Sequence, residues 1–184
     1  LGVDVDNVNP EDDPRFRQYW EAYHHRMARN GVSVEAAKAT VRRSNTVIAA
    51  LMVHLGDADA MLCGTVGRYH AHLDNIRDII GVEPGAPGLA ALNAIMLHER
   101  TLFICDTYVH EDPSAELLAG IAKMAATEVH NFGLPPKVAF LSHSNFGSSK
   151  DASALKVRRA RDLFRALAPD VECDGEMHGD SALS

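Results

Sequence analysis

The second half of the chain alternates between short apolar runs and longer amphipathic stretches, and this alternation limits the fold more than any other feature. The apolar runs have the length of buried strands and lie at 102–105, 138–141 and 171–173. Between them, the spacing predicts a helix that starts at Asp112-Pro113 and stops at Gly133, and another from about Ala152 to Leu167. Strands and helices in this order predict parallel strands with right-handed crossovers, so we expect an α/β fold.

The first half of the chain has mainly helical spacing. A proline in the first turn, an apolar stripe and a glycine stop predict a helix from Asp13-Pro14 to Gly31. Further helices are expected after a capping serine at Ser33, from Asn45 to Gly56, and within 66–80. One short apolar run, Ala60 to Cys63, suits a buried strand.

A cluster of glycine and proline, "GVEPGAPG" at 81–88, interrupts the helical pattern. After it, the runs 89–97 and 102–105 flank "HER" and suggest a hairpin of two strands, although the spacing of the first run also fits a helix. We therefore predict a mostly helical lobe with short strands over residues 1–100, and a strand–helix–strand lobe over 101–184.

Charge and hydropathy exclude two classes of partner. A net charge of -7 and a pI near 5.8 do not suit a surface for nucleic acid, which requires clustered Lys and Arg. The apolar stretches are about ten residues long, short of the roughly 18–20 that cross a bilayer. We expect a cytoplasmic protein with three buried, reduced cysteines, and both ends of the sequence read as those of a piece of a longer protein.

The turn "LSHSNFGSSK", residues 141–150, is the most informative segment for function. Its hydroxyl and amide groups, a glycine and the start of the next helix suit a phosphate or pyrophosphate; the residues are Ser142, Ser144, Asn145, Gly147, Ser148 and Lys150. The turn matches neither GxxxxGK[ST] nor GxGxxG, and loops of this composition are also common helix caps. Both readings stay open at this point.

Acidic and histidine residues were weighed as catalytic or metal-binding groups. Asp106, Asp174, Glu176 and Asp180 follow the predicted strands, where carboxylates more often cap the next turn; without a basic partner they would also repel phosphate. His70 and His72 are two positions apart on a helix and point to different faces. We assign no catalytic residue and no metal site to this sequence.

Four ordered blocks resemble the phosphate acetyltransferase/butyryltransferase family: "LGDADAMLCG" (55–64), "FICDTYVHEDPSAELLAGIA" (103–122), "PKVAFLSHSNFGS" (136–148) and "DGEMHGDSAL" (174–183). The sequences of these blocks are most similar to the branch of the family that is fused C-terminal to the catalytic part of bacterial NADP-dependent malic enzymes. The resemblance implies a three-layer α/β/α sandwich with a largely parallel sheet plus a helical lobe, of which this chain is a fragment.

The resemblance also implies partners. It places CoA or acetyl-CoA in the cleft between two lobes of a homodimer or higher homo-oligomer, and adds Asp106, Thr107 and Arg68 to the turn residues as ligand-binding groups. In a malic enzyme, NADP and a divalent metal, Mg or Mn, would be bound by parts of the protein outside this sequence. The serine and arginine that active transferases use in catalysis also fall outside it.

One departure from the family bears on activity. The segment "GTVGRYHAHLDNIRDIIG" is similar to one in which active transferases place an arginine that holds the acyl phosphate, and Asp74 stands there. A carboxylate at that position repels a phosphoryl group, although Arg68 or Arg77 could compensate. We expect a regulatory domain that senses acetyl-CoA; the alternatives are an active phosphate acetyltransferase and a purely structural dimerisation module.

Overall fold

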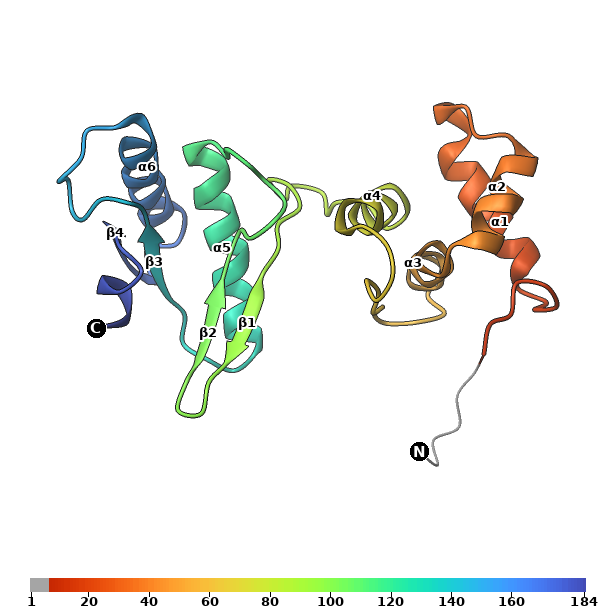
Figure 1. The fold of residues 1–184 in the computed structure, drawn as a ribbon, viewed down its shortest axis with the longest axis horizontal. Helices are drawn as coiled ribbons and strands as arrows, with labels where there is room; N and C mark the ends of the chain where they lie inside the picture. Colours follow the sequence, from red (N-terminus) through yellow and green to blue (C-terminus); the bar gives the residue numbers. More distant parts are fainter. Residues whose placement is uncertain (1–6) are drawn as a thin grey trace. The chain divides into compact units, whose positions relative to one another are not determined.

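The computed structural model describes residues 7–184, and the chain forms two compact units that divide between Glu83 and Pro84 (Figure 1). The division falls before the predicted boundary at residue 100, because the strands of the 93–104 hairpin fold with the second unit. The segment that breaks the helical pattern, 81–88, spans the division. Each unit is described below by itself.

The first unit consists of four α-helices: α1 (Phe16–Met27), α2 (Val34–Arg43), α3 (Asn45–Leu55) and α4 (Tyr69–Ile79). A short 3-10 turn, Ala28–Asn30, extends α1, and Gly31 follows it in the left-handed conformation. The hydroxyl oxygens of Ser33 and Ser44 accept hydrogen bonds from backbone N–H groups in the first turns of α2 and α3. The serine cap and the glycine stop predicted from the sequence are thus confirmed.

The helices of the first unit enclose one apolar core. Tyr19 of α1, Val41 of α2, Leu51 of α3 and Ile79 of α4 are each almost completely buried in it. The strand predicted at Ala60 to Cys63 was wrong: the segment has no regular structure, and Leu62 is 100% exposed. No strand pairs with it among residues 7–184, and of its apolar side chains Met61 packs against the core of the first unit.

The second unit contains two sheets of two strands each. β1 (Asn93–Met96) and β2 (Thr101–Ile104) form the predicted antiparallel hairpin. β3 (Lys137–Leu141) and β4 (Glu172–Met177) pair in parallel, with Val138 opposite Cys173 and Phe140 opposite Gly175. In the described part of the chain β2 pairs with β1 alone, so only two of the three strands expected to be parallel are so. The order of elements predicts their type but not which strand edges meet.

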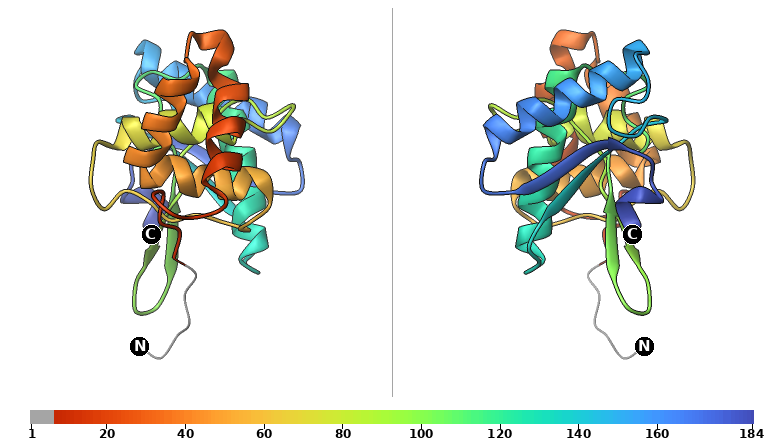
Figure 2. Two further views of the ribbon diagram at one scale, coloured as in Figure 1. Left: turned by 90° about the vertical axis from the view of Figure 1, so that its right-hand side faces the viewer. Right: turned by 90° about the vertical axis from the view of Figure 1, so that its left-hand side faces the viewer.

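Two helices, α5 (Ala115–Asn131) and α6 (Ala152–Leu167), pack against each other and against the β3–β4 sheet; the right-hand view of Figure 2 shows α6 lying along β4. Alanines of α5 at positions 115, 119, 122 and 126 line one face and let α6 approach closely. Phe140 of β3 and Phe164 of α6 complete this core, with ring centroids 5.7 Å apart. The α/β fold is therefore confirmed, and α6 begins and ends where the sequence predicted.

Two smaller expectations were wrong. Ser114, not Asp112, caps α5, because the Ser114 hydroxyl accepts the Leu117 N–H while Asp112 forms an ion pair with Lys156. The cysteines are not buried: Cys63 and Cys105 are exposed and Cys173 is half-buried, all as free thiols. Among residues 7–184, no helix is both long and apolar enough to cross a membrane.

The segment after the division rests on α5 at Gly120. A Cβ atom at Gly120 would lie 2.7 Å from Cγ of Pro87, which is shorter than a van der Waals contact. The next residue, Gly88, lies beside Leu117 of the same helix. Gly120 therefore provides the space into which Pro87 packs, and this contact anchors the start of the second unit.

We predict that Gly120→Ala lowers the free energy of unfolding by about 1–3 kcal/mol through overpacking, although alanine normally stabilises a helix by roughly 0.5–1 kcal/mol. Urea unfolding would measure the change. On a Pro87→Gly background the same substitution should cost much less, because the opposing ring is gone. A stabilising effect of Gly120→Ala alone would show that Pro87 does not pack there.

Candidate functional site

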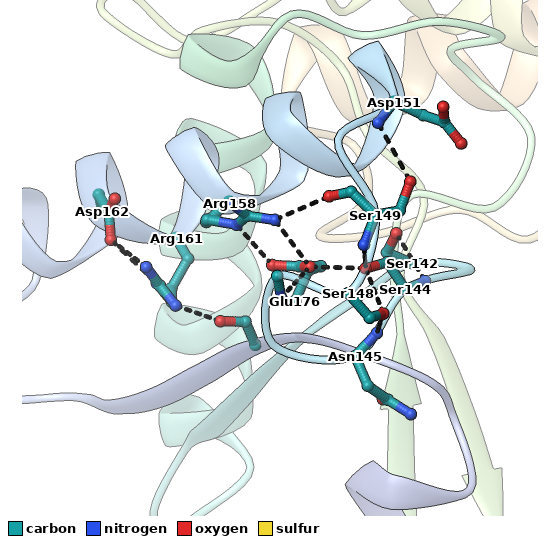
Figure 3. A network of polar contacts seen from close by, with 12 residues as sticks. Ser142, Ser144, Asn145, Ser148, Ser149, Asp151, Arg158, Arg161, Asp162 and Glu176 are labelled. Atoms are coloured by element: carbon teal, nitrogen blue, oxygen red, sulfur yellow. Dashed lines mark hydrogen bonds and ion pairs between the residues drawn. The ribbon is translucent and has the colours of Figure 1, made fainter.

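The turn between β3 and α6 is built around a buried carboxylate, that of Glu176 near the end of β4 (Figure 3). Glu176 is 0% exposed. Its Oε1 accepts hydrogen bonds from the Ser144 hydroxyl at 2.9 Å and from the Gly147 N–H at 2.8 Å. A charge removed from water in this way requires an opposite charge and filled hydrogen-bonding positions.

The opposite charge is Arg158 on α6. Its Nε donates to Oε2 of Glu176 at 2.9 Å and a terminal nitrogen donates to Oε1 at 3.1 Å, so the pair is bidentate. The same guanidinium donates to the backbone oxygen of Ser149 at 3.2 Å. Arg158 thus joins α6, β4 and the turn, and with 30% of its side chain exposed it keeps contact with water.

The pKa of Glu176 lies well below its ordinary value. The hydrogen bonds from Arg158 are the largest cause, and those from the Gly147 N–H and the Ser144 hydroxyl add to it, while burial acts in the opposite direction. In turn, the hydrogen bond to Glu176 raises the pKa of Arg158. The pair is therefore fully ionised at neutral pH.

Ser144 is the centre of the turn's own hydrogen bonds. It is 1% exposed, and because its single proton is donated to Glu176, it accepts from the Ser149 N–H at 3.0 Å and from the Ser148 hydroxyl at 3.1 Å. The Ser148 oxygen accepts the Asn145 N–H at 3.1 Å. The hydroxyls that suggested a phosphate site are thus largely used inside the turn.

The backbone of the turn is left-handed at two successive residues, Phe146 with φ 47° and Gly147 with φ 91°. This conformation lets the Gly147 N–H reach Glu176, while the Phe146 N–H donates to the backbone oxygen of Glu176 at 2.8 Å. Of these two N–H groups, that of Gly147 points at the carboxylate and that of Phe146 at a backbone carbonyl, so together they tie the turn to β4. The turn does hold an anion, but that anion is the protein's own carboxylate.

Other polar groups of the turn point outward. His178, after β4, donates from Nε2 to the His143 backbone oxygen at 2.7 Å, which leaves Nδ1 to accept from the Asn145 amide at 3.3 Å. His143 lies 3.2 Å from Asp151, and the pKa of Asp151 is lowered by hydrogen bonds from Ser149 and then His143. Lys150 is exposed beside them.

The remaining residues predicted from the resemblance have separate surroundings. Asp106 accepts hydrogen bonds from the N–H groups of Ala91 and His110, and Thr107 donates to Asn93. Arg68 belongs to the first unit, immediately before α4. Their part in binding a ligand stays a prediction, as does that of the turn residues.

The preference for capping over catalysis holds for three of the four acidic residues. Asp106, Asp174 and Asp180 each accept a hydrogen bond from a backbone N–H close to them in sequence. The view that the acidic set has no basic partner was wrong, because Arg158 lies against the buried Glu176 and Arg165 lies 3.7 Å from Asp174. No group of three or more His, Cys, Asp or Glu side chains able to hold a metal is found within residues 7–184.

Comparison with known proteins agrees with this architecture. The family described as "Phosphate acetyl/butaryl transferase" matches residues 1–184. The chain belongs to this family. It is 50% identical over 182 residues to an NADP-dependent malic enzyme of Salmonella typhimurium, covering 99% of this chain and 24% of that protein. It is 33% identical over 186 residues to a phosphate acetyltransferase of Nitratidesulfovibrio vulgaris, covering 100% of this chain and 26% of that protein.

Among solved structures, a phosphotransacetylase from Streptococcus pyogenes superposes with a TM-score of 0.82 at 27% identity, covering 98% of this chain and 57% of that one. The chain thus spans about a quarter of the two curated relatives and little more than half of the solved structure. The fold and family predicted from the four sequence blocks are confirmed.

We predict that the two halves of the Glu176–Arg158 pair are unequal. Arg158→Gln should lower the free energy of unfolding by about 3–5 kcal/mol, because it leaves a buried carboxylate uncompensated. Glu176→Gln should cost less, since the partly exposed guanidinium can be hydrated. The control is Arg159→Gln, which breaks the exposed pair with Glu116 and should cost less than about 1 kcal/mol. Equal effects of Arg158→Gln and Arg159→Gln in urea unfolding would refute this assignment.

The pair also predicts a pH dependence. Because folding lowers the pKa of Glu176 below its ordinary 4.5, the stability that the carboxylate contributes is complete above about pH 4.5 and is lost as the pH falls toward the folded pKa. The stability difference between the native chain and Glu176→Gln should therefore be constant from pH 7 to about pH 5 and shrink below that. Denaturant melts at each pH would detect it, and a difference that grows on acidification would contradict the argument.

Proposed function

We propose that this chain is the phosphotransacetylase-like part of a malic enzyme and that it regulates the enzyme by sensing acetyl-CoA. The observation that carries the proposal is the difference in identity: 50% over 182 residues to a malic enzyme, against 33% over 186 residues to a phosphate acetyltransferase. The whole protein would oxidatively decarboxylate malate to pyruvate, with NADP as in the name of the Salmonella typhimurium relative.

The surroundings of Asp74 support a domain without transfer chemistry. The resemblance puts an arginine that holds the acyl phosphate at this position, and Arg77, which could have replaced it, forms an ion pair with Asp74 at 2.9 Å. The positive charge of Arg77 is therefore matched locally by a carboxylate one helical turn away. A phosphoryl group approaching this part of α4 would meet no net attraction from the pair.

The geometry of the turn assigns different parts to its residues in this proposal. Ser144 and Gly147 are engaged by Glu176 and would act as supports that fix the turn. The exposed side chains of His143 and Lys150 would meet the phosphate-bearing end of CoA. Asn145 is half-buried and its amide bonds to His178, so it would reach the ligand only at the edge of the turn. A turn whose shape is fixed before the ligand arrives avoids the entropy cost of ordering it.

Regulation of a distant catalytic site follows from differential binding. Acetyl-CoA would bind one arrangement of the two units, or of a homodimer, better than another, and its effect on malate turnover can be no larger than that difference in affinity. The divalent metal, Mg or Mn, would be held elsewhere in the whole protein, because the residues described here offer no cluster of ligands for it.

We predict that acetyl-CoA changes the rate of malate oxidation by the full-length protein. Lys150→Glu should raise the acetyl-CoA concentration needed for half of this effect by about tenfold, as expected for the loss of one charge-assisted contact. Lys123→Glu makes the same charge change on the exposed face of α5 and should leave the response unaltered. Steady-state kinetics with both variants provides the measurement. No response of the native protein to acetyl-CoA, together with no binding in calorimetry, would remove the proposal.

An active phosphate acetyltransferase is the second candidate, favoured by the family match and by the phosphotransacetylase fold. The whole protein would then form acetyl-CoA from acetyl phosphate and CoA. Both activities should be measured at the same protein concentration. Formation of acetyl-CoA without malate oxidation would contradict the regulatory proposal and support an active transferase.

A further inference from the structure

The first unit carries a hollow that no part of the proposed function uses. It has a volume of about 640 Å³ and lies between one stripe of α1 and the end of α3. Sites for small molecules have volumes of roughly 300–1,000 Å³, so the hollow is large enough for one. Its lining comes entirely from the first unit.

The lining is positively charged in a chain whose net charge is -7. Arg17 and Arg26 face the hollow with one acid, Glu21, and Glu21 already pairs with Arg17 at 2.8 Å. Two imidazoles, His25 and His54, and the amide of Gln18 add further hydrogen-bond donors. The side chains therefore offer both charge and donors to an anion.

Arg26 is the best-placed of these groups. Its Nε donates to the backbone oxygen of Asp78 at 3.0 Å, which fixes the guanidinium against α4. Within the described chain, its terminal nitrogens have no recorded hydrogen-bond partner. A guanidinium fixed through Nε, with no acceptor on its terminal nitrogens, suits binding of an oxyanion through those nitrogens.

The pKa of His54 reflects both its desolvation and the positive charge near it. Its pKa lies below the ordinary value, first because its surroundings remove water and second because Arg26 repels the imidazolium. An anion placed between them would oppose the second effect. The carbonyl end of α3, which would repel an anion, is partly satisfied, since the N–H groups of Gly56, Asp57 and Ala58 donate to Met52 and Val53.

The floor of the hollow is firm and apolar. Ala22 and Leu55 line it and pack at the same time against the buried core of the first unit. Such a floor can accept the uncharged body of a ligand while the polar rim binds its charged end.

We propose that this hollow is a binding site for a small molecule that carries a phosphate group, held by Arg26 and His54. It is separate from the turn at 142–150, and its success or failure leaves the proposed function as it stands.

Calorimetric titration of the full chain with inorganic pyrophosphate, at constant ionic strength, tests the site. Arg26→Gln and His54→Gln should each weaken binding about tenfold. His54→Gln keeps an exposed polar side chain and should not affect folding. Arg29→Gln, an exposed arginine just beyond α1, is the matched control and should bind like the native chain. Lys150→Glu should keep binding at the hollow, because Lys150 is not among its lining residues, even where the turn binds pyrophosphate as well.

A second readout locates the ligand. Pyrophosphate should protect His54 from carbethoxylation by diethylpyrocarbonate, while the exposed His130 of α5 should react as before. Equal affinity of Arg26→Gln and Arg29→Gln, no protection of His54 in the native chain, or protection of His54 that is lost in Lys150→Glu would each overturn the proposal.

Discussion

The ion pair between Glu176 and Arg158 is the interaction on which the end of the second unit that carries the 142–150 turn depends. The carboxylate has no contact with water, and it is stable there because the guanidinium and two further donors fill its hydrogen-bonding positions. The pair fixes the end of β4 against α6 and closes the turn that follows β3. Loss of the arginine would release three elements together, whereas the helical first unit has a core of its own.

This arrangement changes what the polar turn can do. A serine- and glycine-rich turn before a helix suggests an open cradle for phosphate, yet its inner donors are already used by Glu176. The turn is therefore a preformed platform, and a ligand would meet its outer groups. The hydrogen bonds that fix the turn do not involve the serine and arginine that active transferases use in catalysis. A chain could therefore keep the shape of this turn after losing transfer activity.

Local patterns in the sequence were sufficient to predict most of the elements. The bounds of α6, the cap at Ser33 and the 93–104 hairpin are set by residues close to them in the sequence. The partner of Glu176 was missed because Arg158 lies 18 residues away on the exposed side of a predicted helix, where arginine is ordinary. The run 60–63 failed for a related reason: burial of a strand depends on partners that its own composition does not specify.

Arginines of the two units differ in whether a carboxylate neutralises them. Arg158 is neutralised by a buried carboxylate and Arg77 by Asp74, so both serve the folded chain itself. Among the described residues, Arg26 is bound only through Nε to a backbone oxygen, and it repels the imidazolium of His54, which also lines the hollow. Since an unmatched guanidinium beside an imidazole gains most from an added anion, the first unit is where electrostatics favours a ligand that the fold does not supply.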